Sequence, residues 1–345
     1  MPLTDIIAKN LKNLDLKINR EDYNFLDSNK NLKYPILIGL GGSHAYGTNI
    51  ESSDIDVRGI AANNCDEILL GRDFEQVCNE KTDTTIYSLK KMLSLLANCN
   101  PNIIEFLGLK PEHYLYKTRA GLYLIKNKDI FLSNKCVSSF MGYANSQLYR
   151  MQQKTAHTMS KEDLNIHIAN VIQSVKQSLL TKYNLNDINI FVKDGELKID
   201  ITAEDYPLLD LKNILSEFSK VIKEYNSNSK RNNYASNHNK ISKHAMHLLR
   251  LYMMCEDILL YGKINTYRTK EHDLLMRVRN GEFLDENQKM NKEFFEMVKD
   301  YENRLQKAKE HSILPEKPDY NKIERFAKNV NQSIILGENY WIENV

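Results

Sequence analysis

The chain has 345 residues and a formal net charge of +2, which allows one large domain or two modest ones and indicates no global basic field for nucleic acid. Its five cysteines are scattered, with no Cys-x-x-Cys pair and no metal-like spacing, which favours free thiols in a reducing compartment. Because the sequence has neither a charged-then-apolar leader nor an uncharged apolar run of about 18 residues, we expect a cytoplasmic protein without membrane contact.

Residues 36–43 predict a buried strand followed by an anion-binding turn. A polar amphipathic helix, expected over Leu3–Leu16, precedes this segment and has a packing role. Ile36–Ile38 is a short apolar run typical of a buried strand. Three of the next four residues, ending at Gly42, are glycine, so the chain turns sharply or approaches another group closely. Ser43 then lies at the expected start of a short helix, where its amide and hydroxyl can bind an anion.

An acidic pair, Asp54 and Asp56, follows on a second expected strand. Acidic and apolar residues alternate through Val57, and in a strand this alternation places both carboxylates on one face. Two such carboxylates repel each other unless a cation lies between them, and hard oxygen ligands select Mg²⁺ or Mn²⁺. With Gly42 and Ser43 the pair supplies the groups that phosphoryl or nucleotidyl transfer from a nucleoside triphosphate requires. The alternative is a glycine-rich turn followed by an edge strand with solvated acids.

Two other glycine-loop chemistries are excluded by single residues. The dinucleotide motif G-x-G-x-x-G needs glycine at the position of His44 and an acidic residue at the usual distance of about 20 positions. This sequence meets neither requirement. The motif G-x-x-x-x-G-K-[ST] lacks its lysine, because Thr48 follows Gly47 directly. The sequence therefore predicts neither a Rossmann nor a P-loop nucleotide site.

Gly42-Ser43 followed by Asp54-x-Asp56 resembles the signature of the DNA polymerase beta-like nucleotidyltransferase superfamily. The longer string from Gly41 to Ile60 resembles one branch of it, the RNA-repair-associated (RlaP-type) nucleotidyltransferases. Further similar strings are Phe74–Val77, Asp83–Lys91, Asn100–Leu107, Lys243–Arg250 and Leu275–Gly281. The resemblance implies an α+β fold: a polymerase-beta-like catalytic domain, with a short mixed sheet flanked by helices, followed by a mostly helical domain with one β-hairpin.

The same resemblance implies two domains with separate functions. The catalytic domain is expected over residues 1–115, and the helical domain, which binds nucleotide and substrate, over residues 116–345. Gly42 and Ser43 would hold the triphosphate, while Asp54 and Asp56 would bind Mg²⁺ or Mn²⁺.

The superfamily pattern also expects a third acid, on a third strand. The β-branched run Lys81–Ile86 is the expected strand, and Asp83 is the candidate for the third catalytic and metal-binding carboxylate. Three acids suit two cations, which would stabilise the attacking and the leaving oxygen together. The alternative is that Asp83 only caps the following helix.

The second half of the chain carries mostly helical patterns, including an expected helix over Lys161–Leu185. One β-hairpin is predicted near residues 188–201, with Asp194-Gly195 as its turn. An Asn- and Ser-rich stretch over residues 226–239 is expected to be a surface loop, in which Lys230 and Arg231 could contact nucleic acid.

A basic stripe is predicted on a helix that begins near residue 240. In helical spacing Lys243, His247 and Arg250 lie on one face, where they could neutralise a triphosphate. A salt-bridged or solvated face is the alternative, and zinc binding is disfavoured because the two histidines of this segment lack further ligands at suitable spacing.

The prediction is a Mg²⁺- or Mn²⁺-dependent enzyme that transfers a nucleoside monophosphate from a triphosphate to an acceptor hydroxyl and releases pyrophosphate. The family context favours an RNA acceptor. Transfer to a protein or small molecule, as in toxin-type adenylyltransferases, and a non-catalytic nucleotide-binding module are the alternatives. The sequence does not identify the nucleotide or the oligomeric state.

Overall fold

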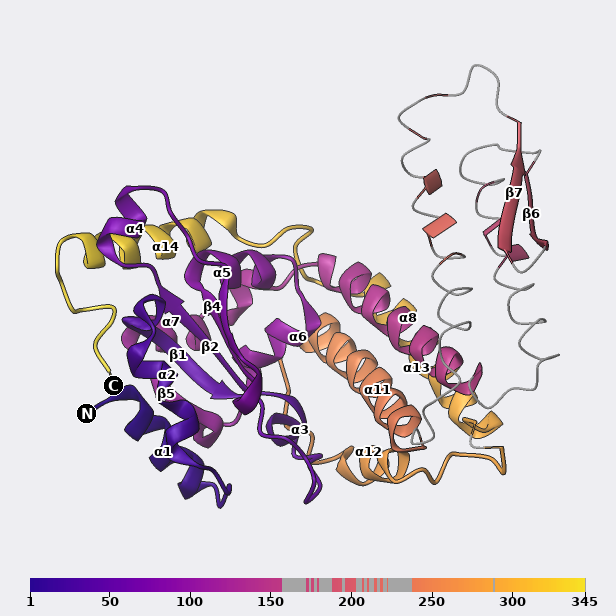
Figure 1. The fold of residues 1–345 in the computed structure, drawn as a ribbon, viewed down its shortest axis with the longest axis horizontal. Helices are drawn as coiled ribbons and strands as arrows, with labels where there is room; N and C mark the ends of the chain where they lie inside the picture. Colours follow the sequence, from indigo (N-terminus) through magenta and orange to yellow (C-terminus); the bar gives the residue numbers. More distant parts are fainter. Residues whose placement is uncertain are drawn as a thin grey trace. The chain divides into compact units, whose positions relative to one another are not determined.

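The computed structural model describes residues 1–156, 238–287 and 289–344. Between residues 157 and 237 it describes residues 172–173, 175–176, 179, 188–193, 196–202, 207, 210, 214–215, 218–219 and 222. The chain forms two compact units (Figure 1). Unit 1 comprises Met1–Leu148, Ser242–Phe283 and Met290–Val345; unit 2 comprises Tyr149–Ile241 and Leu284–Lys289.

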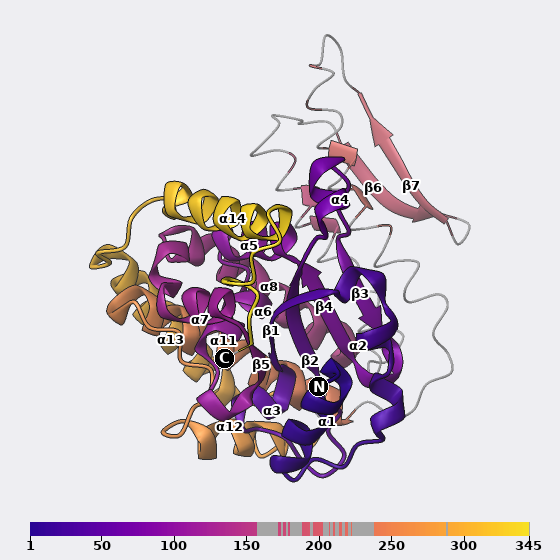
Figure 2. The same ribbon diagram turned by 90° about the vertical axis from the view of Figure 1, so that its left-hand side faces the viewer.

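Unit 1 contains a five-stranded mixed sheet in the order β3-β4-β2-β1-β5 (Figure 2). Its strands are β1 (Tyr34–Leu40), β2 (Val57–Ala62), β3 (Gln76–Asn79), β4 (Thr84–Ser88) and β5 (Tyr114–Lys117). β2 and β4 are parallel, whereas the other neighbouring pairs are antiparallel. This sheet, the helices around it and the hairpin of the second half confirm the predicted α+β class. The expected catalytic domain over residues 1–115 and helical domain over residues 116–345 stay a prediction.

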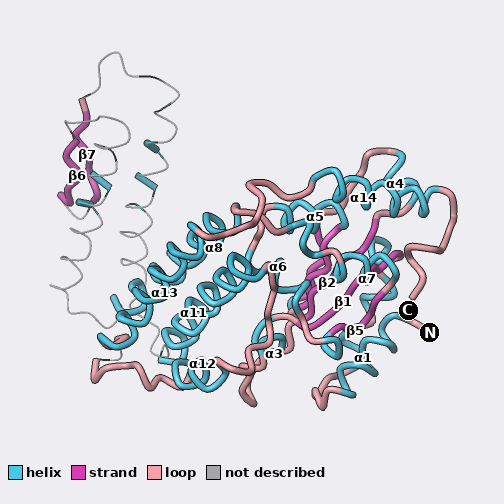
Figure 3. Tube along the Cα trace, turned by 180° about the vertical axis from the view of Figure 1, so that it is seen from behind, coloured by secondary structure: helices cyan, strands magenta, loops and turns pink. Residues whose placement is uncertain are grey.

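Helices account for most of the remaining described chain (Figure 3). Those before β5 are α1 (Leu3–Asn13), α2 (Phe25–Ser28), α3 (Gly42–Tyr46), α4 (Cys65–Leu69), α5 (Leu89–Ala97) and α6 (Pro101–Ile104). Those after it are α7 (Arg119–Lys126), α8 (Lys135–Ala156), α11 (His238–Tyr261), α12 (His272–Arg279), α13 (Lys292–Glu310) and α14 (Tyr320–Ile335). Short 3₁₀ turns include η3 (Glu80–Thr82) and η4 (Glu105–Gly108). Across the described residues no helix is both long and apolar enough to cross a membrane.

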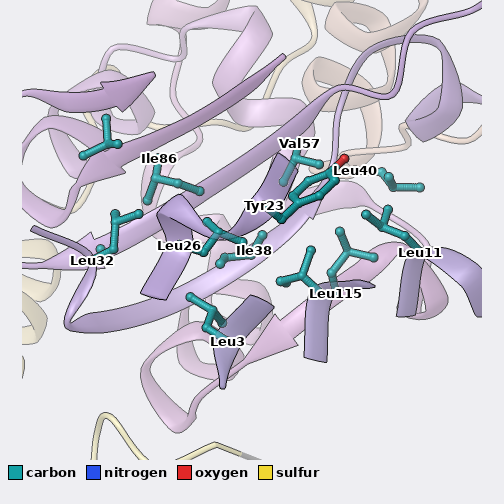
Figure 4. Close-up of a cluster of buried hydrophobic side chains, with 13 residues drawn as sticks. Leu3, Leu11, Tyr23, Leu26, Leu32, Ile38, Leu40, Val57, Ile86 and Leu115 are labelled. Atoms are coloured by element: carbon teal, nitrogen blue, oxygen red, sulfur yellow. The ribbon is translucent and has the colours of Figure 1, made fainter. Parts of the chain in front are cut away.

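One face of the sheet is covered by α1 and α2 (Figure 4). Their apolar side chains pack on those that β1, β2 and β4 direct to this face, and the cluster includes Leu11, Leu26, Ile38, Val57 and Ile86. α7 packs against β1 beside Leu37, which points to the opposite face because side chains alternate along a strand. A Cβ at Gly121 of α7 would lie 2.6 Å from the backbone oxygen of Ile36, so this helix approaches the sheet closely. Burial on both faces fixes the strand ends that carry the acidic residues.

Several local signals in the sequence act as expected. The side chain of Asn100 accepts a hydrogen bond from the amide of Asn102, and Pro101 opens α6. α11 ends at Tyr261, and Gly262 follows with φ +60°, a left-handed conformation that glycine adopts without strain. Such caps set the helix limits that the sequence alone could predict.

Unit 2 contains the predicted hairpin, formed by β6 (Ile188–Lys193) and β7 (Glu196–Ile201) in antiparallel register. Its buried apolar cluster consists of Val175, Leu179, Ile190 and Ile214. The expected Asp194-Gly195 turn and the expected contacts of Lys230 and Arg231 lie outside the described residues, as does most of the expected helix over Lys161–Leu185.

Candidate active site

Strand register brings two of the predicted acids together. Val57 of β2 lies opposite Thr84 of the parallel strand β4, so Asp56 and Asp83, which precede them, are neighbours as well. The amide of Val57 donates to the backbone oxygen of Asp83 at 3.1 Å. Both acids lie just outside the strands on which they were expected: β2 begins at Val57 and β4 at Thr84. Asp83 ends the turn η3 with φ +40°, so the chain bends sharply there and then enters the sheet.

Gly42, two residues after the end of β1, lies against one of these acids, Asp56. Because β1 and β2 are antiparallel, the end of β1 lies beside the start of β2, and the amide of Gly41 donates to the backbone oxygen of Asp56 at 2.8 Å. Gly42 opens α3 with φ +55°. A Cβ at this position would lie 1.8 Å from Oδ2 of Asp56, so only glycine fits. Ser43 is the next residue of α3 and is half-buried.

Arg58 joins the two acids. Its Nη2 lies 3.0 Å from Oδ1 of Asp56 and 3.3 Å from Oδ1 of Asp83, and its Nη1 donates to the backbone oxygen of Asp83 at 2.6 Å. The glycine and acid motifs had predicted no role for Arg58. Its position two residues after Asp56 was a usable signal, because residues two apart in an extended segment share a face.

Asp56 titrates in an unusual environment. Burial, followed by a hydrogen bond with Asp83, raises the pKa of Asp56 to about 6, although the positive charges of Arg58 and Lys243 oppose the shift. Lys243 lies on α11 and is exposed. Because its charge acts on Asp56, the structure brings one member of the predicted basic stripe near this acid. A carboxylate and a cation supplied by distant segments thus meet in unit 1.

Asp56 and Asp83 fit a divalent cation in their chemistry, because their carboxylate oxygens converge on a positive group and Mg²⁺ prefers oxygen ligands. Within the described part of the chain, no group of three His, Cys, Asp or Glu side chains is arranged to hold a metal ion. Asp54 is exposed and lies two residues before Asp56. Its part in metal binding therefore stays a prediction.

Arg250, a second member of the predicted stripe, is buried and paired. Its guanidinium carbon lies 3.2 Å from the ring centroid of Tyr46, and its Nη2 lies 3.7 Å from Oε2 of Glu105. The hydroxyl of Tyr46 donates to the same carboxylate oxygen at 2.6 Å. Burial raises the pKa of Glu105, and Arg250 opposes this rise. Arg250 is 5% exposed, so it fixes α11 against α3 and η4; its predicted contact with a triphosphate stays a prediction.

His247, the remaining member of the stripe, is half-buried on α11, one turn from Lys243. In the turn before it, Nδ1 of His244 lies 2.8 Å from Oε1 of Gln147 on α8. The helical spacing of the stripe is confirmed, whereas the nucleotide-binding role of His247 is untested.

The loop between α3 and β2 is held by α12. Nη2 of Arg279 donates to Oγ of Ser53 at 3.1 Å, and Nε2 of His272 lies 3.0 Å from the backbone oxygen of Gly47. Burial, with a smaller contribution from Arg279, lowers the pKa of His44. These contacts lock the segment between the serine of α3 and the acids, and sequence periodicity gave no signal for them.

Residues 27–167 match the model of one family, described as RlaP: RNA repair pathway DNA polymerase beta family. This confirms the resemblance over the segment that carries Gly42, Ser43, Asp54, Asp56 and Asp83. The similar strings at 243–250 and 275–281 lie outside the matched residues. Comparisons with curated proteins and with solved structures found no match.

Proposed function

We propose that this chain, whose residues 27–167 carry the RlaP family match, transfers a nucleoside monophosphate from a nucleoside triphosphate to an acceptor hydroxyl. The family is DNA polymerase beta-like, and its members are nucleotidyltransferases of an RNA repair pathway. The observation that supports the proposal best is the meeting of Gly42, Asp56 and Asp83 at the edge of the sheet where β1 ends and β2 and β4 begin.

In the proposed reaction the acceptor oxygen attacks the α-phosphorus of the triphosphate. A new bond forms between that oxygen and phosphorus, the bond from the α-phosphorus to its bridging oxygen breaks, and pyrophosphate leaves. The carboxylate of Asp83, about half-exposed beside Asp56, receives the proton of the acceptor hydroxyl. The amide and hydroxyl of Ser43 bind phosphate oxygens beside Gly42.

Asp54, Asp56 and Asp83 are the residues that would hold Mg²⁺ or Mn²⁺. When bound, such an ion supplies positive charge that stabilises the attacking and leaving oxygens. Lys243 adds a fixed positive charge beside Asp56, where the triphosphate is expected.

We infer that the acceptor is RNA, because the matched family belongs to an RNA repair pathway. The near-balanced net charge of +2 places any RNA-binding surface in a local patch. Contacts with the base decide which triphosphate is used, so all four nucleoside triphosphates are tested.

The test is the transfer of label from four α-labelled nucleoside triphosphates, with Mg²⁺ or Mn²⁺ present. Total RNA and total protein serve as acceptors in separate reactions. Asp56→Asn is the inactive variant, and Asp66→Asn, which changes an exposed acid in the first turn of α4, is the matched control. Label that enters RNA with the wild type and the control, but not with Asp56→Asn, supports the proposal.

Two other outcomes contradict parts of the proposal. Label in protein alone would replace the RNA acceptor by a protein acceptor while leaving the reaction intact. Equal transfer by Asp56→Asn and the wild type would remove the proposed site altogether.

A further inference from the structure

We propose that Arg58 is an internal counter-cation which holds Asp56 and Asp83 until the metal–nucleotide complex binds, and which then exchanges the carboxylates for phosphate oxygens. The inference rests on the proposed function, because it assumes that these two acids bind a divalent ion. It adds a role for a residue that contacts both acids.

Both acids share one nitrogen of Arg58. One guanidinium nitrogen, Nη2 of Arg58, lies within 3.0 and 3.3 Å of carboxylate oxygens from both Asp56 and Asp83. Two neighbouring carboxylates carry a repulsive interaction that a cation between them relieves. Arg58 thus already makes the charge compensation that a divalent ion would make, so the ion and the guanidinium compete for the same oxygens.

Only the side chain of Arg58 is free to move. Its backbone is paired with Gly39 of β1 on one side and with Thr85 of β4 on the other, inside the five-stranded sheet. Its side chain is 26% exposed, so solvent and ligands reach the ion pair from outside. Exchange therefore requires a rotation of side-chain bonds and no change in the sheet.

The released guanidinium would lie beside the proposed nucleotide site. A Cβ at Gly41 would lie 3.0 Å from Cγ of Arg58, so the arginine side chain runs along the glycine segment that precedes Ser43. That segment is the proposed site of the triphosphate. Guanidinium groups bind phosphate oxygens through two parallel hydrogen bonds, and such pairs are among the strongest polar contacts in proteins.

Binding of the metal–nucleotide complex is thus an exchange of ion pairs. Before binding, the acids pair with Arg58 and the nucleotide phosphates pair with the metal. After binding, the acids pair with the metal and the phosphates gain Arg58. Because coupling between two ligands is reciprocal, nucleotide should tighten metal binding and metal should tighten nucleotide binding, both through Arg58.

The test measures the affinity of the full-length protein for Mn²⁺ alone, from the paramagnetic resonance signal of the free ion. Arg58→Met removes the competing charge. Arg20→Met is the matched control, because Arg20 forms an exposed ion pair with Asp5 at 2.6 Å on another part of unit 1. Arg58→Met should bind Mn²⁺ about tenfold more tightly than the wild type, since a positive charge a few ångströms from the ligands is lost. Arg20→Met should match the wild type.

A second titration adds a non-hydrolysable nucleoside triphosphate. It should raise the Mn²⁺ affinity of the wild type by a larger factor than that of Arg58→Met. Arg58→Gln, which keeps a polar side chain, is measured alongside, and thermal unfolding of each variant confirms that it is folded. Unchanged or weaker Mn²⁺ binding in folded Arg58→Met or Arg58→Gln would overturn the inference, because Arg58 would then only position the acids.

The experiment separates the inference from the proposed function. Nucleotidyl transfer by the wild type, together with no gain in Mn²⁺ affinity on loss of Arg58, would reject the inference alone. Absence of both transfer and Mn²⁺ binding in the wild type and in Arg58→Met would reject both.

Discussion

Gly42 touches the carboxylate of Asp56 so closely that it has no room for a side chain. Both its φ of +55° and the 1.8 Å that would separate a Cβ from Oδ2 of Asp56 oppose substitution. Gly71 has a similar φ of +64° but nothing within 4 Å of its Cβ position, so it is a matched control. The two glycines therefore differ in contact and share the backbone strain.

We expect Gly42→Ala to abolish nucleotidyl transfer and to lower the free energy of unfolding by at least about 2 kcal/mol more than Gly71→Ala does. The additional loss reflects displacement of Asp56, whereas the strain of the left-handed backbone is common to both variants. Urea unfolding measures the two free energies. Equal losses in the two variants would show that Asp56 is not held against the glycine.

The raised pKa of Asp56 links this residue to stability as well as to activity. Its pKa is raised from 3.8 to about 6, chiefly by burial, so between these two pH values the folded protein binds a proton more tightly than the unfolded chain. The free energy of unfolding therefore falls as pH rises through this range. Ionised Asp56 costs stability in the metal-free protein at neutral pH.

We expect metal-free Asp56→Asn to be more stable than the wild type at pH 8, by about 3 kcal/mol at most, and to lose this advantage near pH 4. Mn²⁺ should reverse the order at pH 8 by stabilising only the wild type. Thermal or urea unfolding at both pH values, in a chelator and then in Mn²⁺, measures these differences. A variant that is less stable than the wild type at pH 8 in chelator would contradict the argument.

Among the helices, one buried ion pair attaches α11 to η4 beside α3. Arg250 of α11 contacts Tyr46 of α3 and Glu105 of η4, and the exposed Lys243 lies on the same helix. Because Arg250 fixes the helix, it also fixes the position of Lys243 relative to Asp56. The Arg250–Glu105 pair therefore links two segments that are distant in the sequence and that both contribute charged side chains to the candidate site.

We expect Arg250→Met to lower the free energy of unfolding by about 3–5 kcal/mol at pH 8, since it leaves Glu105 buried without its cation. Part of this loss should be regained in the double variant Arg250→Met, Glu105→Gln. The pKa of Glu105 is already raised by burial, so the single variant should also recover stability as pH falls and the carboxyl becomes protonated. A double variant no more stable than the single one would show that the pair contributes through packing instead.

The sequence predicted which strands and helices form the site better than it predicted the residues at which they begin. The apolar run at Ile36–Ile38 predicted β1 correctly, whereas the acidic alternation predicted a strand over Asp54–Val57, of which only Val57 belongs to β2. Periodicity placed Asp83 inside a strand, but the η3 turn holds it just outside, where register with Asp56 depends on pairing between β2 and β4. Arg250 shows the same limit, because helical spacing gives a face but does not show whether solvent or another helix covers it.

At the scale of the whole molecule, unit 1 is assembled from segments that are far apart in the sequence. Its segment Ser242–Phe283 contains α12 and most of α11, and its segment Met290–Val345 contains α14. The ring of Tyr123 on α7 stacks on Phe326 of α14 with centroids 4.9 Å apart. Trp341 packs on the edge of the same tyrosine ring, and its backbone oxygen accepts a hydrogen bond from Ala120 at 3.0 Å. The part of the chain that carries the acids is therefore completed by the part that follows the second unit.

We expect residues 1–148 expressed alone to be unstable, although they contain every strand of the sheet and all three candidate acids. The fragment would leave uncovered the apolar face around Tyr123, on which Phe326 of α14 stacks, and the buried Glu105 would lose Arg250. Exposed apolar surface of this extent favours partly folded, aggregating states. Circular dichroism and binding of an apolar dye measure the effect, and co-expression with residues 238–345 should restore a folded complex. A cooperative, dye-free unfolding transition in the isolated fragment would show instead that the sheet carries its own stability and that the later helices serve the substrate alone.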